Sequence, residues 1–460
     1  MNRLPLIAAS VAALALASCA AGTGSVSQVA PSATERSEAE SYGNYLAGRF
    51  AANQHDMADA AKFYQASLRD DANNPDLLER TFLYTASAGD IGKASEYAGR
   101  VVAQQNDSRA ARLVLAVQDI AKKDYSGARQ QLALSAGGPF TSLTVSLLDA
   151  WAAAGMGNTD AALKDIDELK SQGGTDALAS YQRALIFDYE GHTAEAEAAY
   201  KSAMVDATAG PRITEAYGRF LERAGRGEEA KAIYARLKTG VTPHPVTVEA
   251  DARIAKGTIP DRLVATPAEG AAEALFSIAA SLNDATSADV AILYLRLSLY
   301  LRPDMDLGKI LLADRFEALR KYQDAIETYQ TIDKSSPYYD IAAIQIAVDE
   351  DRQDHTDKAI ALLKTFTASH PDNIEAWTAL GDAYRGSEHF VEAADAYDHA
   401  LRQVGTIEKS DWPLFYARGI SEERSKRWDA AERDLKQALK LKPDEPQVLN
   451  YLGYSWIDQG

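Results

Sequence analysis

The chain has 460 residues but only one cysteine, Cys19. A single thiol cannot form a disulfide within the chain, so the fold must be stable without one. Seven histidines are scattered, and no two of them have the spacing of HExxH or another common metal-binding motif. A GxSxG nucleophile motif is also absent. We therefore name no catalytic residue, no metal and no cofactor, and we predict that the protein is not an enzyme.

Basic residues are outnumbered. The chain has 48 Lys and Arg against 66 Asp and Glu, which gives a formal net charge of −18. A field of this sign repels nucleic acid and anionic lipid. Charged residues make up 25% of the chain and hydrophobic residues 46%, as in ordinary globular proteins. We expect a folded protein with no nucleic-acid partner.

An alanine recurs every 34 residues over most of the chain. The positions are Ala60, Ala94, Ala128, Ala162, Ala196 and Ala230 and, after an interruption, Ala291, Ala325, Ala359 and Ala393. In seven repeats a large side chain follows one helical turn later, at Tyr64, Tyr200, Tyr234, Leu295, Tyr329, Leu363 and Tyr397. Small residues at a fixed step allow two antiparallel helices to approach closely, and the large ones fill the space beside the contact.

The clearest repeat adds further residues to this pattern. It contains Trp377, Leu380, Gly381, Tyr384, Ala393, Tyr397 and Ala400. This arrangement resembles the tetratricopeptide repeat (TPR) family, and the resemblance covers nearly the whole chain after residue 40. It implies an all-α solenoid of about eleven and a half helix-turn-helix repeats in two arrays.

The interruption divides the chain. We expect a first array of about six repeats over residues 41–238, a Pro/Gly-rich connector over 239–270, and a second array of about five repeats over 271–460. Within the connector, residues 246–255 are expected to form one short helix. The connector is interpreted as a hinge, as a strap across the groove, or as a tolerated insertion. A twelfth repeat ends after its first helix, which favours a fragment of a longer protein.

The N-terminus has the features of a secretion signal. A short basic region precedes an apolar run over residues 6–16, which is too short to span a membrane as a helix. Leu16, Ala17, Ser18 and Cys19 then resemble the lipobox of bacterial lipoproteins. The resemblance implies cleavage before Cys19 and attachment of lipid to its thiol.

The residues after Cys19 suggest a location and a linker. Ala20 and Ala21 stand where an inner-membrane lipoprotein would carry aspartate, which favours the periplasmic face of the outer membrane. Residues 20–40 are mostly small and polar and are interpreted as a flexible tether.

The TPR resemblance also indicates where a partner would bind. In that family the fifth and ninth positions of each first helix line the concave surface. The candidate partner-binding residues at these positions are Leu113, Val117, Leu147, Trp151, Tyr181, Leu185, Phe276, Ile310, Ile344 and Tyr416. The alternative for each residue is burial between neighbouring helices, since apolar stripes usually form core. Trp151 is the strongest candidate, because tryptophan in a groove is a typical hot spot.

Together these features resemble large TPR lipoproteins of the bacterial envelope. The resemblance implies a non-enzymatic adaptor that binds proteins or peptides and reaches the membrane through Cys19. Such proteins recruit a periplasmic protease to its substrates, often murein hydrolases, or assist assembly of secretins or outer-membrane barrels. The alternative is a substrate-recognition arm of an enzyme whose catalytic domain lies beyond residue 460. No feature indicates an oligomeric state.

Overall fold

The computed structural model describes residues 33–459, apart from residues 106, 136–138, 171–174, 206–209, 238–243 and 283. Throughout these described residues the chain forms helices joined by short turns, and they contain no strand. Cys19 and residues 20–32 of the predicted tether lie outside the described part.

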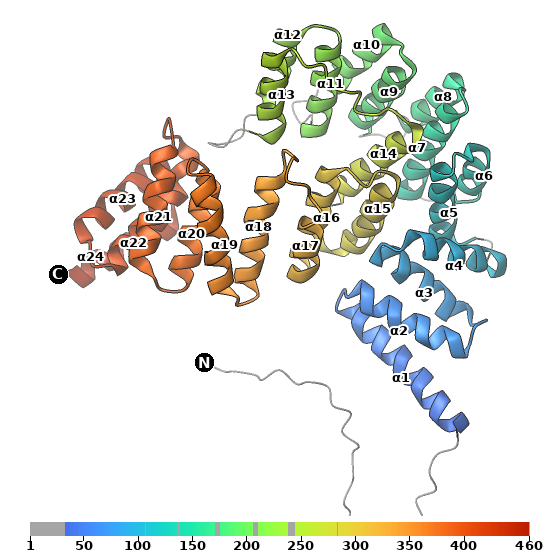
Figure 1. The fold of residues 1–460 in the computed structure, drawn as a ribbon, viewed down its shortest axis with the longest axis horizontal. Coiled ribbons are helices and arrows are strands. Elements are labelled where there is room, and N and C mark those ends of the chain that lie inside the picture. Colours follow the sequence, from blue (N-terminus) through green and yellow to red (C-terminus); the bar gives the residue numbers. More distant parts are fainter. Residues whose placement is uncertain are drawn as a thin grey trace, which may run out of the picture.

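The first half of the chain forms six antiparallel helical hairpins (Figure 1). Their helices are α1 (Ala33–Asn53), α2 (Met57–Asp70), α3 (Pro75–Ala88), α4 (Ile91–Gln104), α5 (Arg109–Ala121), α6 (Tyr125–Ser135), α7 (Pro139–Gly155), α8 (Thr159–Lys170), α9 (Asp176–Glu190), α10 (Thr193–Ala203), α11 (Pro211–Arg223) and α12 (Gly227–Tyr234). A lone helix, α13 (Pro245–Lys256), follows them.

The second half forms five more hairpins and one further helix. These are α14 (Pro267–Ser281), α15 (Ala288–Leu301), α16 (Asp306–Ala318), α17 (Tyr322–Tyr329), α18 (Tyr339–Arg352), α19 (Thr356–Ser369), α20 (Ile374–Gly386), α21 (Phe390–Gln403), α22 (Trp412–Arg424), α23 (Trp428–Leu441) and α24 (Pro446–Gln459). The all-α solenoid of about eleven and a half repeats is therefore confirmed.

All ten alanines of the 34-residue series are fully buried, as expected for residues at the contact between two helices. Ala393 is fully buried, and a Cβ added to Gly381 would lie 2.6 Å from the Tyr397 ring. A Cβ added to Gly218 would lie even closer to the Tyr234 ring, at 2.3 Å. The aromatic ring of the second helix thus fills the space that a missing side chain leaves on the first.

Two predicted boundaries need correction. Helix α1 begins at Ala33, so residues 33–40 belong to a helix and not to the tether. Their alanine, glutamate and arginine residues favour helix. Helix α14 begins at Pro267, within the predicted connector, because Thr266 caps it and Pro267 suits its first position.

The helix expected in the connector is present as α13. Pro245 occupies its first turn, and Gly257 ends it with a φ of 68°, in the left-handed region that glycine adopts readily. The proline and glycine residues that suggested an interruption therefore bracket a helix.

The two arrays pack against each other. Helix α14 lies along α7 and α9, and α15 lies against α3 and α5 (Figure 1). One apolar core includes residues from Ala51 to Ala342 and continues across the connector. This packing contradicts a hinge between two separate arms. Its cause is the composition of α14, which consists mostly of small and apolar residues and has ten of its 15 residues buried.

Candidate partner-binding surface

The first array has no open groove at the predicted positions. The concave sides of α5, α7 and α9 face α14 and α15. All six candidates on these helices are 6% exposed or less, namely Leu113, Val117, Leu147, Trp151, Tyr181 and Leu185. These residues are core, so the prediction that they contact a partner is wrong for this structure.

Trp151 is the clearest case. Its side chain is fully buried, and its indole Nε1 donates a hydrogen bond of 2.8 Å to Gln182 Oε1. A Cβ added to Gly270 on α14 would lie only 2.2 Å from the indole ring. Helix α14 thus presents its glycine to the tryptophan and takes the place that we predicted for a partner.

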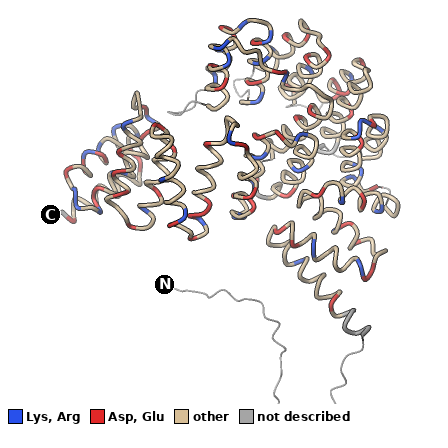
Figure 2. The backbone as a smooth tube through the Cα atoms, in the orientation of Figure 1, with Lys and Arg blue, Asp and Glu red and all other residues tan. Residues whose placement is uncertain are grey.

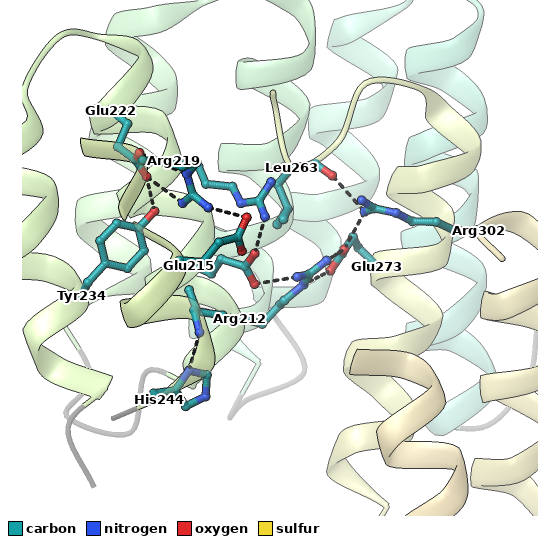
Figure 3. Close-up of polar contacts among 12 residues, drawn as sticks. Arg212, Glu215, Arg219, Glu222, Tyr234, His244, Leu263, Glu273 and Arg302 are labelled. Atoms are coloured by element: carbon teal, nitrogen blue, oxygen red, sulfur yellow. Dashed lines mark hydrogen bonds and ion pairs between the residues drawn. The ribbon is translucent and has the colours of Figure 1, made fainter. Parts of the chain in front are cut away.

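A buried ionic network joins the two arrays (Figure 3). Glu273 of α14 is fully buried and accepts hydrogen bonds from Arg212 Nε of α11, at 3.0 Å, and from Arg302 Nη1, at 3.1 Å. The Arg302 Nη1 also donates to the Leu263 carbonyl oxygen at 2.9 Å. Burial of this kind is tolerable because the carboxylate has two cationic partners.

The network continues on α11. Glu215 pairs with Arg212 at 2.6 Å and with Arg219 at 2.9 Å. Burial alone would raise the pKa of Glu215, but the two guanidinium groups outweigh it and lower that pKa. Glu215 and Arg219 occupy the groove positions of the sixth repeat, so charged residues there serve internal contacts.

A second set of contacts fixes α13. Glu222 of α11 accepts hydrogen bonds from the Tyr234 hydroxyl at 2.7 Å and from Arg253 Nη2 of α13 at 3.0 Å. Val246 and Ala250 of α13 are buried beside α12. The connector helix is therefore held firmly against the end of the first array.

In the second array, residues at the fifth and ninth positions of first helices do line open pockets. A pocket of about 390 Å³ between α18 and α20 contains Ile344 and Val348 of α18 and Thr378 and Asp382 of α20. These are the fifth and ninth positions of the two helices. A pocket of about 380 Å³ on α22 and α24 contains the next such residues, Tyr416, Asn450 and Tyr454.

A third pocket adjoins the first and extends it toward α13. It measures about 670 Å³, lies between α13 and the starts of α18 and α20, and shares Ile341 and Glu375 with the α18 pocket. We call the surface formed by these three pockets the open groove. Two of the ten candidates lie along it: Tyr416 is half-buried, and Ile344 lines its pocket but is only 6% exposed and also belongs to a core cluster.

The remaining two candidates do not line these pockets. Phe276 is buried in α14, and Ile310 of α16 is half-buried and packs against the main core. The residues that sequence reasoning missed are those of α13, since nothing in the repeat spacing places a connector helix beside α18. Thr378 was also missed, although it has the same position in its repeat as Ile344.

The described residues contain no cluster of three or more His, Cys, Asp or Glu that could hold a metal ion. No helix among them is long and apolar enough to cross a membrane.

The fold and the open groove define a helical-repeat scaffold. More particularly, residues 344–406 and 416–460 match the model of the family described as "Tetratricopeptide repeat", so the repeats in these residues are tetratricopeptide repeats. The matched residues include most of the open groove. No curated protein matches the chain in sequence.

Solved structures overlap with the chain at low similarity. A chain of the APC/C hetero-tetramer Cut9–Hcn1 has 15% identity and a TM-score of 0.37, over 93% of this chain and 92% of that one. Yeast Tom70 has 16% identity and a TM-score of 0.34, over 92% and 89%. YrrB, described as a TPR protein with an unusual peptide-binding site, has 14% identity and a TM-score of 0.30, over 39% and 91%. Overlaps at this level do not indicate a shared partner.

Proposed function

We propose that this protein is a non-enzymatic scaffold that binds partner proteins or peptides in the open groove of α18–α24. The observation that carries the proposal is the alignment of pockets on successive first helices of the second array. The corresponding positions of α5, α7 and α9 in the first array are covered by α14 and α15. We therefore assign partner binding to the second array.

The groove has the chemistry that peptide binding requires. Half-buried apolar side chains, Ile341, Val348 and Ala379, lie beside the polar groups of Gln345 and Thr378. An extended segment or an amphipathic helix can place apolar anchors on such a surface while its polar groups remain hydrogen-bonded.

A single substitution tests this surface. Ala379→Arg places a long cationic side chain in the pocket between α18 and α20, where it should block binding. Ala361→Arg is the matched control, since Ala361 is exposed on α19 of the same repeat array. We expect crosslinking in the native cell envelope, followed by partner identification, to recover partners at least about tenfold less with Ala379→Arg than with the control. Equal recovery from both variants, at equal thermal stability, would contradict the proposal.

We further propose that the scaffold is anchored by lipid at Cys19 to the periplasmic face of the outer membrane. The lipobox-like residues 16–19 and the alanines after them support this location. Partners there would include a periplasmic protease or hydrolase, or components of an envelope complex under assembly. Cys19→Ser should move the protein from the membrane fraction to the soluble periplasmic fraction, because a membrane anchor of this kind depends on its acyl chains. Continued membrane attachment would show that the anchor is elsewhere.

A further inference from the structure

The pocket between α13 and the second array combines an apolar lining with acidic residues. Its apolar lining comes from Pro245 and Val248 of α13, Pro337 and Ile341 at the start of α18, and Ile374 of α20. Val248 is 54% exposed, so its side chain is available to a partner. The pocket thus offers apolar contacts from three helices.

Four carboxylates surround these apolar residues, from Glu249, Asp340, Asp372 and Glu375. Lysine and arginine are spread over both arrays (Figure 2), but none is among the residues that line this pocket. Glu249 pairs with Arg253 of its own helix at 2.8 Å, and Asp340 lies 3.8 Å from His370. Asp372 and Glu375 are exposed and have no ion pair with any residue that the structure describes.

The N-termini of three helices add positive charge at this pocket, but less than the negative charge of the carboxylates. Helices α13, α18 and α20 all begin there, and each N-terminus carries roughly half a positive charge. Their total of about +1.5, even together with the charge of Arg253 that pairs with Glu249, is smaller than the four negative charges of the carboxylates. The pocket therefore attracts cations and repels an acidic segment.

We propose that this pocket binds a polypeptide segment in which lysine or arginine side chains lie next to apolar ones. This inference rests on the proposed function and specifies the chemistry of the partner. The cationic groups pair with the exposed carboxylates, and the apolar side chains cover Val248 and Ile341. Charge selects the partner and speeds its encounter, while the apolar contact supplies most of the affinity.

Helix α13 contributes one rigid wall. Its inner face, Val246 and Ala250, is buried, and Arg253 is bound to Glu222. Its outer face, with Val248 and Glu249, is therefore presented in a fixed position. A preorganised wall lowers the ordering cost of binding. The connector thus forms part of the binding site.

Three synthetic peptides of equal length test the assignment with the full-length protein in detergent. One alternates lysine with valine, one alternates glutamate with valine, and one alternates lysine with serine. By fluorescence anisotropy we expect the Lys/Val peptide to bind at least about tenfold more tightly than either of the others, and to weaken as salt is raised. Equal affinity for the Lys/Val and Glu/Val peptides would overturn the proposal.

A pair of charge variants locates the site. Asp340→Asn with Glu375→Gln should weaken Lys/Val binding roughly three- to tenfold, as expected for two exposed ion pairs. Asp357→Asn with Glu392→Gln makes the same charge change at exposed positions on α19 and α21 and should leave binding unchanged. An equal loss in both double variants would mean that net charge alone attracts the peptide, which would also overturn the proposal.

The two proposals can fail separately. If Ala379→Arg abolishes partner recovery but the Lys/Val peptide does not bind, the open groove remains the partner site and only the assignment of a basic partner is wrong. If the peptide binds and partner recovery is unaffected by Ala379→Arg, the proposed function fails instead.

Discussion

At the scale of single residues, the contact of Trp151 with Gly270 decides which face of the first array is closed. The indole occupies the space beside a glycine backbone and donates to Gln182. It also packs edge-on against Tyr189, with ring centroids 6.2 Å apart. A tryptophan predicted to be a binding hot spot is therefore a core residue between two arrays.

Substitutions at this contact should destabilise the protein. Trp151→Ala should lower the free energy of unfolding by about 3–5 kcal/mol, because it leaves a cavity and an unpaired Gln182 oxygen. Gly270→Ala should cost about 1–3 kcal/mol, because its Cβ would overlap the indole. Gly99→Ala on α4 is the matched control, since no atom lies within 4 Å of the added Cβ. Urea unfolding followed by circular dichroism measures all three, and an unchanged midpoint for Trp151→Ala would show that the residue is not core.

Asp165 of α8 is another residue whose surroundings have a measurable effect. It shares Arg129 with Asp149, at 3.6 Å and 2.8 Å from the guanidinium respectively. Burial and the nearby negative charge of Asp149 raise the pKa of Asp165 from its ordinary 3.8 to about 7. The folded protein therefore binds a proton at Asp165 over a pH range in which the unfolded chain does not.

This shift predicts a pH-dependent stability. Because the folded-state pKa is the higher one, the contribution of Asp165 to stability is present below about pH 4 and is lost as the pH rises through about 7. Asp165→Asn removes this loss, so the variant should exceed the wild type by roughly 1–3 kcal/mol at pH 8 and match it near pH 4. Urea unfolding at both pH values checks this, with Asp160→Asn, an exposed position on the same helix, as the control. A gap that is larger at pH 4 would refute the assignment.

At the scale of helices, the 34-residue alanine spacing predicts ten of the eleven hairpins, all but α22–α23, because each contact lies within one repeat. Ala393, Gly381 and Tyr397 are close in sequence, so local spacing is sufficient. The site was predicted only in part, since burial of Leu147 depends on α14, which lies more than 100 residues away. One signal was available: α14 is rich in small and apolar residues, with Glu269 and Glu273 as its only charged ones, whereas a repeat helix with an open groove keeps one polar face.

Glu273 holds α14 in place through its ion pairs with Arg212 and Arg302. Removal of the Glu273 charge should therefore loosen α14. Glu273→Gln removes the fully buried carboxylate and leaves the half-buried Arg212 and Arg302 with too little negative charge, which should cost about 3–5 kcal/mol. Hydrogen exchange should then accelerate in α14 and α11 together, because the network joins them. Glu229→Gln, which removes an exposed partner of Arg226, is the control and should leave exchange unchanged. Acceleration confined to α14 would mean that the network does not couple the arrays.

At the scale of the whole molecule, the boundary between hydrophobic cores does not coincide with the interruption of the repeats in the sequence. The sequence interruption lies at the connector, but the largest core continues across it to Ala342. A separate core begins at Ile344 and another surrounds Phe415 and Leu452. The largest core therefore extends from α1 to the first turn of α18, and most of the open groove lies on the smaller unit that follows.

This division predicts the order of unfolding. Under rising urea, amides of α14 and α15 should stay protected as long as those of α5 and α7, because all four helices share one core. Amides of α20–α24, which rest on smaller cores, should exchange at lower urea. Native-state hydrogen exchange with mass spectrometry resolves the two groups. If protection instead changed at the connector, with α14–α24 exchanging together and before α1–α12, the packing of α14 into the first array would not contribute to stability, and the positions around Trp151 would again be available to a partner.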